Sequence, residues 1–214
     1  HKDAALSMSI NSSRNWNKTG DNLVKPTLVD FINGNSTTII KSGYPMSSFW
    51  SYDFAGLDPQ NGAPMFNLMD VDKETAKNDI SSFLVYSGER NPNFTGGVSF
   101  SFRYKSFTAS TSFSAILGGK TRLPNPYADT NNGNKLPPAE NNVSRLLNDR
   151  WKKPGDELTT NLPSLIVGNL YYITHPNGAS SALPVTMWAQ SSAQVVDASF
   201  MRCRGLDLSY RLDQ

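Results

Sequence analysis

Side chains that could catalyse a reaction or hold a metal are sparse in this chain of 214 residues. Asp70, Asp72 and Glu74 alternate like the first oxygen ligands of a calcium loop, but the glycine of the sharp turn and an acidic residue at the twelfth position are missing. His1 and His175 are the two imidazoles, and neither has a serine or cysteine partner in a nucleophile motif. We therefore expect no catalytic residue, no metal and no cofactor.

A pair of adjacent carboxylates, Asp156 and Glu157, has the chemistry of glycoside hydrolysis, in which two acids act on either side of a sugar bond. The pair follows Pro154 and Gly155 without a pattern that shapes a cleft, so we interpret it as solvated loop charge and the protein as a non-enzyme. The net charge of +2, without a stripe of Lys and Arg among aromatics, argues against nucleic acid as a partner. Cys203, the single cysteine, excludes an internal disulfide.

The segment 97–117 shows a two-residue alternation that predicts two strands joined by a tight turn at Lys105 and Ser106. This turn places Tyr104 directly opposite Phe107, so the aromatic side chains of both strands point to one side and the hydroxyl and charged side chains to the other. The aromatic positions on the first side, which we predict to face lipid, are Phe100, Phe102, Tyr104, Phe107 and Phe113.

Both strands are about 10 residues long, which matches the ~9–11 residues that a tilted strand needs to cross a bilayer. An apolar outer face and an inner face of Ser and Thr are typical of a membrane β-barrel with a wet lumen. Trp16, Tyr44 and Trp50 fit the aromatic girdle at the membrane interface. No apolar run approaches the ~20 residues of a membrane helix, so we exclude a helical membrane protein. The same hairpin also fits a soluble β-sandwich, which would bury its aromatic side.

Further strands are predicted from alternation or β-branched content at 5–11, 37–41, 48–57, 80–86 and 199–212. In the last of them the apolar residues change parity between Cys203 and Leu206. A β-bulge at Arg204-Gly205 would return all the apolar residues of this strand to one face, and we therefore predict a bulge there.

A region rich in Asn, Pro and Gly covers residues 119–197 and exceeds the usual length of a loop in a compact domain. Extracellular loops of membrane barrels permit this length, so we expect a long extracellular loop. Within it, apolar residues at helical spacing predict a short helix over 142–152, with Asn141 or Asn142 as the N-cap and a stop at Pro154.

Four blocks of sequence occur in the order found in one family of membrane transporters. They are GYPMSSFWSYDFAGLDPQNGAPMF (43–66), YSGERNPNFTGGVSFSFRYKSF (86–107), RWKKPGD (150–156) and DASFMRCRGLDLSYRL (197–212). With them the chain resembles the SusC/RagA family of TonB-linked transporters in the outer membrane of Bacteroidetes. The resemblance implies an all-β fold, in which antiparallel transmembrane strands belong to a plugged barrel of about 22 strands. It also implies import of oligosaccharides or peptides, with energy from TonB and a SusD-like surface lipoprotein as the lid.

The resemblance makes residues 1–214 a partial TonB-dependent-receptor barrel domain. The plug, the TonB-contacting segment and the final strands have no counterpart here, so we expect the remaining barrel and plug segments to complete the barrel in the bilayer. His1 stands in place of Met and no signal peptide follows, which indicates a processed, trimmed or excised product. The Asp-rich, glycine-containing turn of many relatives is absent at 70–79, which argues against an ion site.

Arg150, Trp151 and Asp156 form the exposed constellation that most resembles the family, and we predict that they face substrate or partner. Trp151 either anchors its helix to the barrel rim or helps to form a mouth that meets substrate or lid. The alternative interpretation is a soluble, secreted β-sandwich carbohydrate-binding module, in which Trp50, Tyr52 and Trp151 would stack on sugars. The two differ in what covers the aromatic face of the strands, which is lipid in the barrel and a second sheet in the sandwich.

Overall fold

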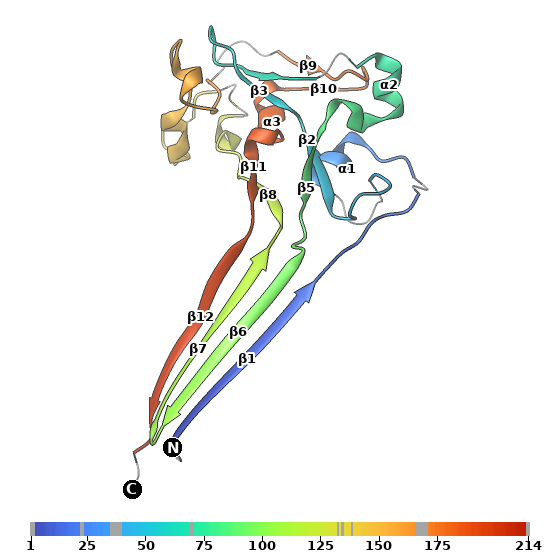
Figure 1. Cartoon of the computed structure of the whole chain (residues 1–214). Helices are drawn as coiled ribbons and strands as arrows, with labels where there is room; N and C mark the ends of the chain where they lie inside the picture. Colours follow the sequence, from blue (N-terminus) through green and yellow to red (C-terminus); the bar gives the residue numbers. More distant parts are fainter. Residues whose placement is uncertain are drawn as a thin grey trace.

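The computed structural model describes residues 3–21, 24–34, 40–68, 71–131, 133, 135–137, 139–165 and 171–212. Figure 1 shows two parts, a long and narrow sheet of four strands and a cap of short strands and helices at one end of it. We use the word cap for the described residues of 15–93 and 118–199. Strand β1 begins and strand β12 ends at the end of the sheet that lies farthest from the cap.

The long sheet has the strand order β1-β6-β7-β12, and every neighbouring pair is antiparallel. Its strands, of 11 residues each, are β1 (Ala4–Arg14), β6 (Phe94–Tyr104), β7 (Phe107–Leu117) and β12 (Phe200–Tyr210). At ~3.3 Å per residue each is roughly 36 Å long, enough to cross an apolar layer of ~25 Å at a tilt of ~45°. The predicted fold class, all-β with antiparallel strands of transmembrane length, is confirmed, and within the described residues the sheet is open at β1 and β12.

The predicted hairpin between β6 and β7 is confirmed residue by residue. Tyr104 pairs with Phe107, which leaves Lys105 and Ser106 as the two-residue turn. Lys105 has a φ of 52°, a positive value of the kind that two-residue hairpin turns need at their first central position. A lysine therefore occupies a backbone conformation that usually selects glycine or asparagine.

The predicted bulge in β12 is also confirmed. The register against β7 shifts between Cys203 and Gly205, so Arg204 is the extra residue. Before the bulge Cys203 lies opposite Phe113, and after it Leu206 lies opposite Thr111. Because the bulge takes up this extra residue, the apolar residues on both sides of it lie on one face of the strand along its whole length.

The cap is connected to the sheet by strands that continue from it. β5 (Val85–Glu89) leads into β6, β8 (Lys120–Arg122) follows β7, and β11 (Val195–Asp197) leads into β12 (Figure 1). The other strands are β2 (Ser48–Ser51), β3 (Phe54–Leu57), β4 (Pro64–Phe66), β9 (Ile173–Thr174) and β10 (Ser181–Ala182). The antiparallel pairs are β2 with β5, β3 with β4, β8 with β11 and β9 with β10.

Three short α-helices complete the cap: α1 (Leu28–Asn33), α2 (Lys73–Asn78) and α3 (Pro184–Ala189). Single 3-10 turns lie at Ile80–Phe83, Ala128–Thr130, Arg145–Asp149, Asp156–Leu158 and Ser192–Gln194. None of the helices in the described ranges is both long and apolar enough to span a bilayer.

Two small hydrophobic cores hold the cap together. One gathers around Trp50 and Phe83 and includes α1, and the other gathers around Tyr127 and Trp188 of α3. Region 119–197 contributes to both cores, through Met187 to the first and Trp188 to the second. The segment expected to be a long loop therefore carries short secondary-structure elements whose buried side chains fix its path.

Several predicted elements of the cap differ from those found. The strand predicted over 48–57 is divided into β2 and β3, because the intervening Tyr52 forms a parallel bridge with Ser191. The strand predicted over 80–86 is a 3-10 turn followed by β5, since Asp79 accepts a hydrogen bond from the N–H of Ser81 and starts the turn. In the run at 37–41, residues 37–39 lie outside the described residues, and 40–41 are not in a strand.

The helix predicted over 142–152 is a shorter 3-10 turn, Arg145–Asp149. It begins at Ser144, whose side chain accepts from the N–H of Leu146, rather than at either asparagine. It ends before Trp151 because the backbone N–H of Trp151 donates to the carbonyl of Leu162 at 2.9 Å, which requires an extended chain.

The predicted girdle role is wrong for Trp50. This side chain is 2% exposed, and its ring lies 5.1 Å from Phe31, 5.2 Å from Tyr44 and 5.4 Å from Tyr86, centroid to centroid. Long-range packing inside the cap, which local alternation does not reveal, explains the difference. Trp16 is exposed just beyond the end of β1, and its girdle role stays a prediction.

Gly62 is a position where the cap depends on the absence of a side chain. Its φ is 70°, and a Cβ there would lie 2.4 Å from the ring of Trp151. We expect Gly62→Ala to destabilise the cap by about 2 kcal/mol or more, from backbone strain together with the collision. The thermal midpoint followed by tryptophan fluorescence measures this. Gly43→Ala is the matched control, because Gly43 has a φ of 83° with open space around it, and its thermal midpoint should fall clearly less. An equal fall of the midpoint in both variants would contradict the role of Trp151.

Candidate functional site

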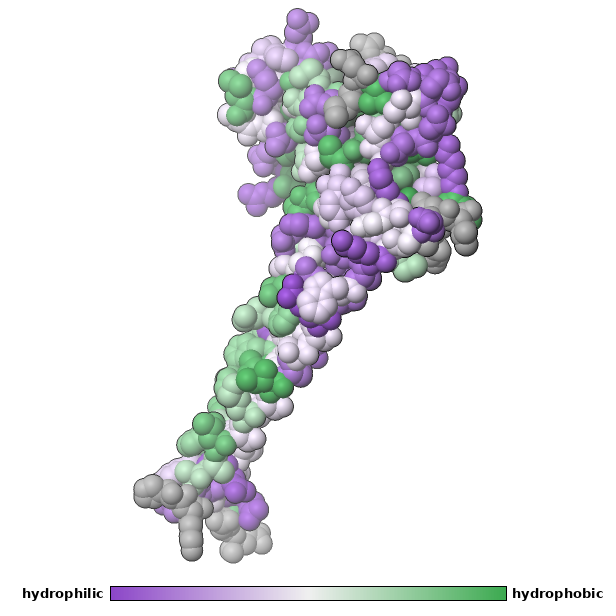
Figure 2. All heavy atoms as spheres, turned by 45° about the vertical axis from the view of Figure 1, so that its right-hand side comes forward, coloured by the Kyte–Doolittle hydropathy of each residue, from purple (hydrophilic) through white to green (hydrophobic). Residues whose placement is uncertain are grey.

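The two faces of the long sheet differ sharply in chemistry, and this difference is the clearest functional feature of the chain. Rows of residues that lie opposite one another across β1, β6, β7 and β12 make one face apolar. Counted from the β6–β7 turn, they are Ala4, Tyr104, Phe107 and Tyr210; Leu6, Phe102, Ala109 and Leu208; Met8, Phe100, Thr111 and Leu206; and Ile10, Val98, Phe113 and Cys203. Figure 2 shows hydrophobic residues along one side of the sheet and hydrophilic ones concentrated on the cap.

All five predicted lipid-facing residues, Phe100, Phe102, Tyr104, Phe107 and Phe113, belong to this apolar face. The face is uncovered within the described residues. Leu6 is 73% exposed and Leu206 is 69% exposed, values that a residue packed on a second sheet would not have. Contact with lipid itself stays a prediction.

The opposite face is built from small hydroxyl side chains with a few charges. Its hydroxyls on the three strands β1, β6 and β7 are Ser7, Ser9, Ser13, Thr95, Ser99, Ser101, Thr108, Ser110, Ser112 and Ser114. Arg202 and Asp207 of β12 and Arg103 of β6 lie at positions of the same parity. Such a face is suited to water or to a polar solute and unsuited to hydrocarbon.

Arg150, Trp151 and Asp156 are brought together in one tight turn of the cap. Asp156 accepts hydrogen bonds from the N–H groups of Lys152 and Lys153, at 3.0 and 3.1 Å. The guanidinium of Arg150 donates to the carbonyl of Leu147 at 2.8 Å. The turn is therefore stabilised by its own backbone, and a substrate- or partner-facing role of these residues stays a prediction.

Trp151 lies on the inner side of this turn and is 8% exposed. Its ring packs against Gly62, and its indole N–H donates to the carboxylate of Glu157 at 3.1 Å. The backbone N–H of Glu157 and this indole lower the pKa of the carboxylate. In this position Trp151 joins the turn to the β3–β4 hairpin, and its ring is not free to stack on a sugar.

The acidic residues considered as calcium ligands have a local role. Asp72 is the N-cap of α2 and accepts from the N–H groups of Glu74 and Thr75, both at 3.0 Å. Hydrogen bonds from Thr75 lower the pKa of Asp72. Asp70 lies outside the described residues.

Two arginines at the junction of cap and sheet form a cluster that sequence inspection missed. The guanidinium groups of Arg90 and Arg122 each lie 4.8 Å from the ring centroid of Phe49, which is fully buried. Cation–π contacts of this kind are strongest where water is excluded. Neither arginine is ion-paired with a carboxylate among the residues that the structure describes.

Arg122 connects the helix α1 and the strand β2 to β8, the strand that follows β7. It donates to the carbonyls of Ile32 and Trp50, at 2.5 and 2.6 Å, and Arg90 donates to the carbonyl of Asn33 at 2.6 Å. The carbonyls of Ile32 and Asn33 are unsatisfied groups at the C-terminus of α1, where cations bind favourably. Burial, together with the neighbouring charge of Arg90, lowers the pKa of Arg122 to about 10.

A buried polar chain links β9 and β10 to the core of the cap. The hydroxyl of Tyr52 lies 2.7 Å from Nε2 of His175, and Nδ1 of His175 lies 2.9 Å from the carbonyl oxygen of Ser180. A neutral imidazole that donates from Nδ1 to Ser180 and accepts from Tyr52 at Nε2 satisfies both contacts. Burial lowers the pKa of His175 and raises that of Tyr52.

We expect the cap to lose stability as the pH falls below about 6.5. The folded state holds His175 neutral, whereas the unfolded chain binds a proton at a pKa near 6.5, so acidification favours unfolding until the lower folded pKa is passed. The measurement is the thermal midpoint of the cap between pH 7.5 and 5. In His175→Gln the thermal midpoint should change less with pH, whatever its value at pH 7.5. If the midpoint of this variant falls with pH as steeply as that of the unsubstituted protein, other groups cause the dependence.

Comparisons with known proteins agree with this description. No protein-family model matches the chain. It is 26% identical over 140 residues to TonB-dependent receptor P3 of Formosa agariphila, an alignment that covers 56% of this chain. The chain spans 14% of the length of that relative.

Solved structures with a similar fold include the RagAB peptide transporter, at a TM-score of 0.63 and 22% identity. The RagAB peptide importer in its open-open and closed-closed states has TM-scores of 0.63 and 0.61, at 24% and 23% identity. Each match covers 98% of this chain and about a fifth of the solved chain. The likeness shows that the fold of the sheet and cap is similar to that of about a fifth of these solved chains.

Proposed function

We propose that this chain forms part of the wall and the extracellular cap of a TonB-dependent transporter in the bacterial outer membrane. The observation that carries the proposal is the two-faced sheet, whose apolar side is continuous over four strands and uncovered within the described residues. Exposure of this apolar surface to water would cost roughly 25 cal/mol per Å². In a bilayer the same surface contacts apolar lipid chains, so this cost is absent.

The unpaired edges of the sheet support a barrel that other segments complete. β1 and β12 each present one edge without a partner strand in the described part of the chain. Unpaired backbone groups are not viable in hydrocarbon, so further strands must pair with both edges in the membrane. The short β6–β7 turn then lies on the periplasmic side and the cap on the extracellular side, as in other membrane barrels.

The proposed substrates are oligosaccharides or peptides, taken up together with a SusD-like lipoprotein. Support for a peptide comes from the solved RagAB structures, whose names describe a peptide transporter or a peptide importer. Support for a glycan comes from the resemblance to the wider family. In this proposal substrate binds at the extracellular face, the lipoprotein closes over it, and the plug rearranges with energy from TonB.

Fractionation of cells that make the complete receptor tests the proposal. We expect the protein in the outer membrane, dependent on detergent for solubility, with slower migration after boiling as a folded barrel unfolds. A tag on the receptor should retain a surface lipoprotein and no soluble partner. Recovery of the receptor as a monodisperse soluble protein without detergent would contradict the proposal and favour the carbohydrate-binding sandwich.

A further inference from the structure

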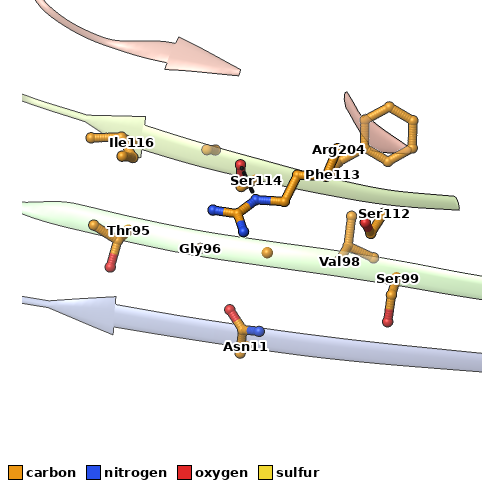
Figure 3. Close-up of a pocket in the computed structure, with 12 residues that line it drawn as sticks. Asn11, Thr95, Gly96, Val98, Ser99, Ser112, Phe113, Ser114, Ile116 and Arg204 are labelled. Carbon is orange, nitrogen blue, oxygen red and sulfur yellow. Dashed lines mark hydrogen bonds between the residues drawn. The ribbon is translucent and has the colours of Figure 1, made fainter. Parts of the chain in front are cut away.

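The polar face of the sheet contains a hollow at the level of the β12 bulge. Its volume is about 360 Å³, and strands β1, β6, β7 and β12 all contribute to it (Figure 3). Gly97, which lines the hollow, presents no side chain between its paired residues Asn11 of β1 and Ser114 of β7. A Cβ on Gly97 would lie 3.1 Å from the amide oxygen of Asn11, so even an alanine would crowd this floor.

The bulge supplies Arg204, which among the described residues is the charged side chain that lines the hollow. Arg204 is the residue inserted between the register positions of Cys203 and Gly205, and its side chain turns to the polar face. There its Nε donates to the hydroxyl of Ser114 at 3.3 Å. In Figure 3 the guanidinium lies beside Ser114, with Asn11 on the far side of β6.

This arrangement leaves the terminal nitrogens of Arg204 available. No bond from either of them to another described residue is present, and Arg204 takes part in none of the ion pairs of the described chain. A guanidinium held at Nε presents two parallel N–H donors, the geometry that a carboxylate accepts as a bidentate pair. Asn11 and the hydroxyls of Ser99 and Ser112 line the same hollow and offer further hydrogen bonds to a ligand.

The surrounding charges favour an anion. Within the strands, the polar face carries Arg103, Arg202 and Arg204 against the single carboxylate of Asp207. A wall with this excess of positive charge attracts anionic solutes and disfavours cationic ones. The bulge therefore has a second consequence besides register, because it places a fixed cation on an otherwise hydroxyl-lined wall.

We propose that the hollow is a substrate-binding subsite for a carboxylate, which Arg204 binds through its two terminal nitrogens while Asn11 and the serine hydroxyls bind neighbouring polar groups. The inference rests on the proposed function, because only in a barrel does this face line a lumen. The shared chemistry is the carboxylate, which a peptide carries at its C-terminus and an acidic glycan carries on its uronic acids.

Binding measurements on the complete receptor in detergent test the subsite with two matched ligand pairs. One pair is tetra-alanine and its C-terminal amide, and the other is tetragalacturonate and tetragalactose. We expect the acid of at least one pair to bind about tenfold more tightly than its neutral partner, as charge-assisted hydrogen bonds typically give. The pair that shows the preference identifies the source of the carboxylate.

Substitutions then connect the preference with Arg204. Arg204→Gln should bring the ratio of the two affinities close to one, and Arg204→Lys, which keeps the charge without the bidentate geometry, should restore part of it. Arg103→Gln, on the same face but near the periplasmic turn, should keep the ratio. Because a ratio does not depend on the folded fraction, a purely structural role of Arg204 would leave it unchanged.

Three results would overturn the subsite. They are equal affinities for acid and neutral ligands in both pairs, an unchanged ratio in Arg204→Gln, and an equal fall of the ratio in Arg103→Gln. The first of these, combined with a lower thermal midpoint of Arg204→Gln, would indicate that Arg204 is paired with a carboxylate of the interior plug instead. If the receptor is correctly located in the outer membrane in these cases, only the subsite fails; if it is not, the proposed function fails first.

Discussion

Replacement of Phe100 by arginine should prevent the receptor from accumulating in the outer membrane. Phe100 lies in the middle of β6 on the apolar face, between Met8 of β1 and Thr111 of β7. An arginine on the lipid face near the bilayer midplane costs about 2–4 kcal/mol, and assembly competes with degradation of the unassembled chain. We expect a loss of most of the folded protein, measured as the boiling-sensitive band of an outer-membrane fraction.

Ser101→Arg is the matched control for this prediction. Ser101 follows Phe100 directly, points to the opposite face, and lies in the row that contains Ser7, Ser110 and Asp207. An arginine there faces the aqueous lumen with a carboxylate in the same row, so the level of folded receptor should stay close to that of the unsubstituted protein. Equal losses in both variants would mean that β6 is buried on both sides, as in a sandwich.

Deletion of Asp207 should have an effect as large, although the residue is exposed. Asp207 is paired with Ser110, so its loss shifts the following part of β12 by one position against β7, which turns Leu208 and Tyr210 to the lumen and Ser209 to lipid. We expect the deletion variant to be absent from the boiling-sensitive band.

Deletion of Arg204 is the matched control and should assemble normally, because its loss joins Cys203 to Gly205 in the register that they already have against Phe113 and Ser112. The two deletions therefore compare a paired residue of β12 with the unpaired residue of its bulge. Normal assembly without Asp207, or failed assembly without Arg204, would contradict the register seen between β7 and β12.

The long sheet is predictable from the sequence because the different media on its two faces select a simple alternation of residue types in each strand. Water on one face and an apolar medium on the other produce a two-residue alternation, and this fixes the register of the hairpin at Tyr104 and Phe107. The bulge is predictable for the same reason, since a bulge that leaves Arg204 unpaired is the simplest way to place both apolar parities of this strand on one face.

The cap is less predictable because its short elements are stabilised by distant partners. Trp50 receives a hydrogen bond at its carbonyl from Arg122, 72 residues later in the chain, and no local pattern encodes that contact. Its strands are two to five residues long, too short for a period to emerge.

The sequence of the cap contains local signals for the ends of its helices. Thr27 and Asp30 form a capping box that marks the start of α1, and Pro184 stands at the first turn of α3. The spacing of Asp72 resembles that of a calcium ligand, but the residue is the N-cap of α2. Helix α3 has little amphipathic period to detect because four of its six residues are buried.

The most direct test of the claim that this sheet is a membrane wall is a scan of the accessibility of each position along β6 to lipid and to water. In a complete receptor whose native cysteines, Cys203 included, are replaced by serine, single cysteines at positions 98–104 are spin-labelled in lipid vesicles, and collision with oxygen and with a water-soluble nickel complex is measured. We predict maxima for oxygen at the even positions, which share the apolar face with Phe100, and maxima for nickel at the odd positions. A profile without two-residue alternation, or even positions shielded from oxygen, would contradict the claim that this sheet separates lipid from lumen.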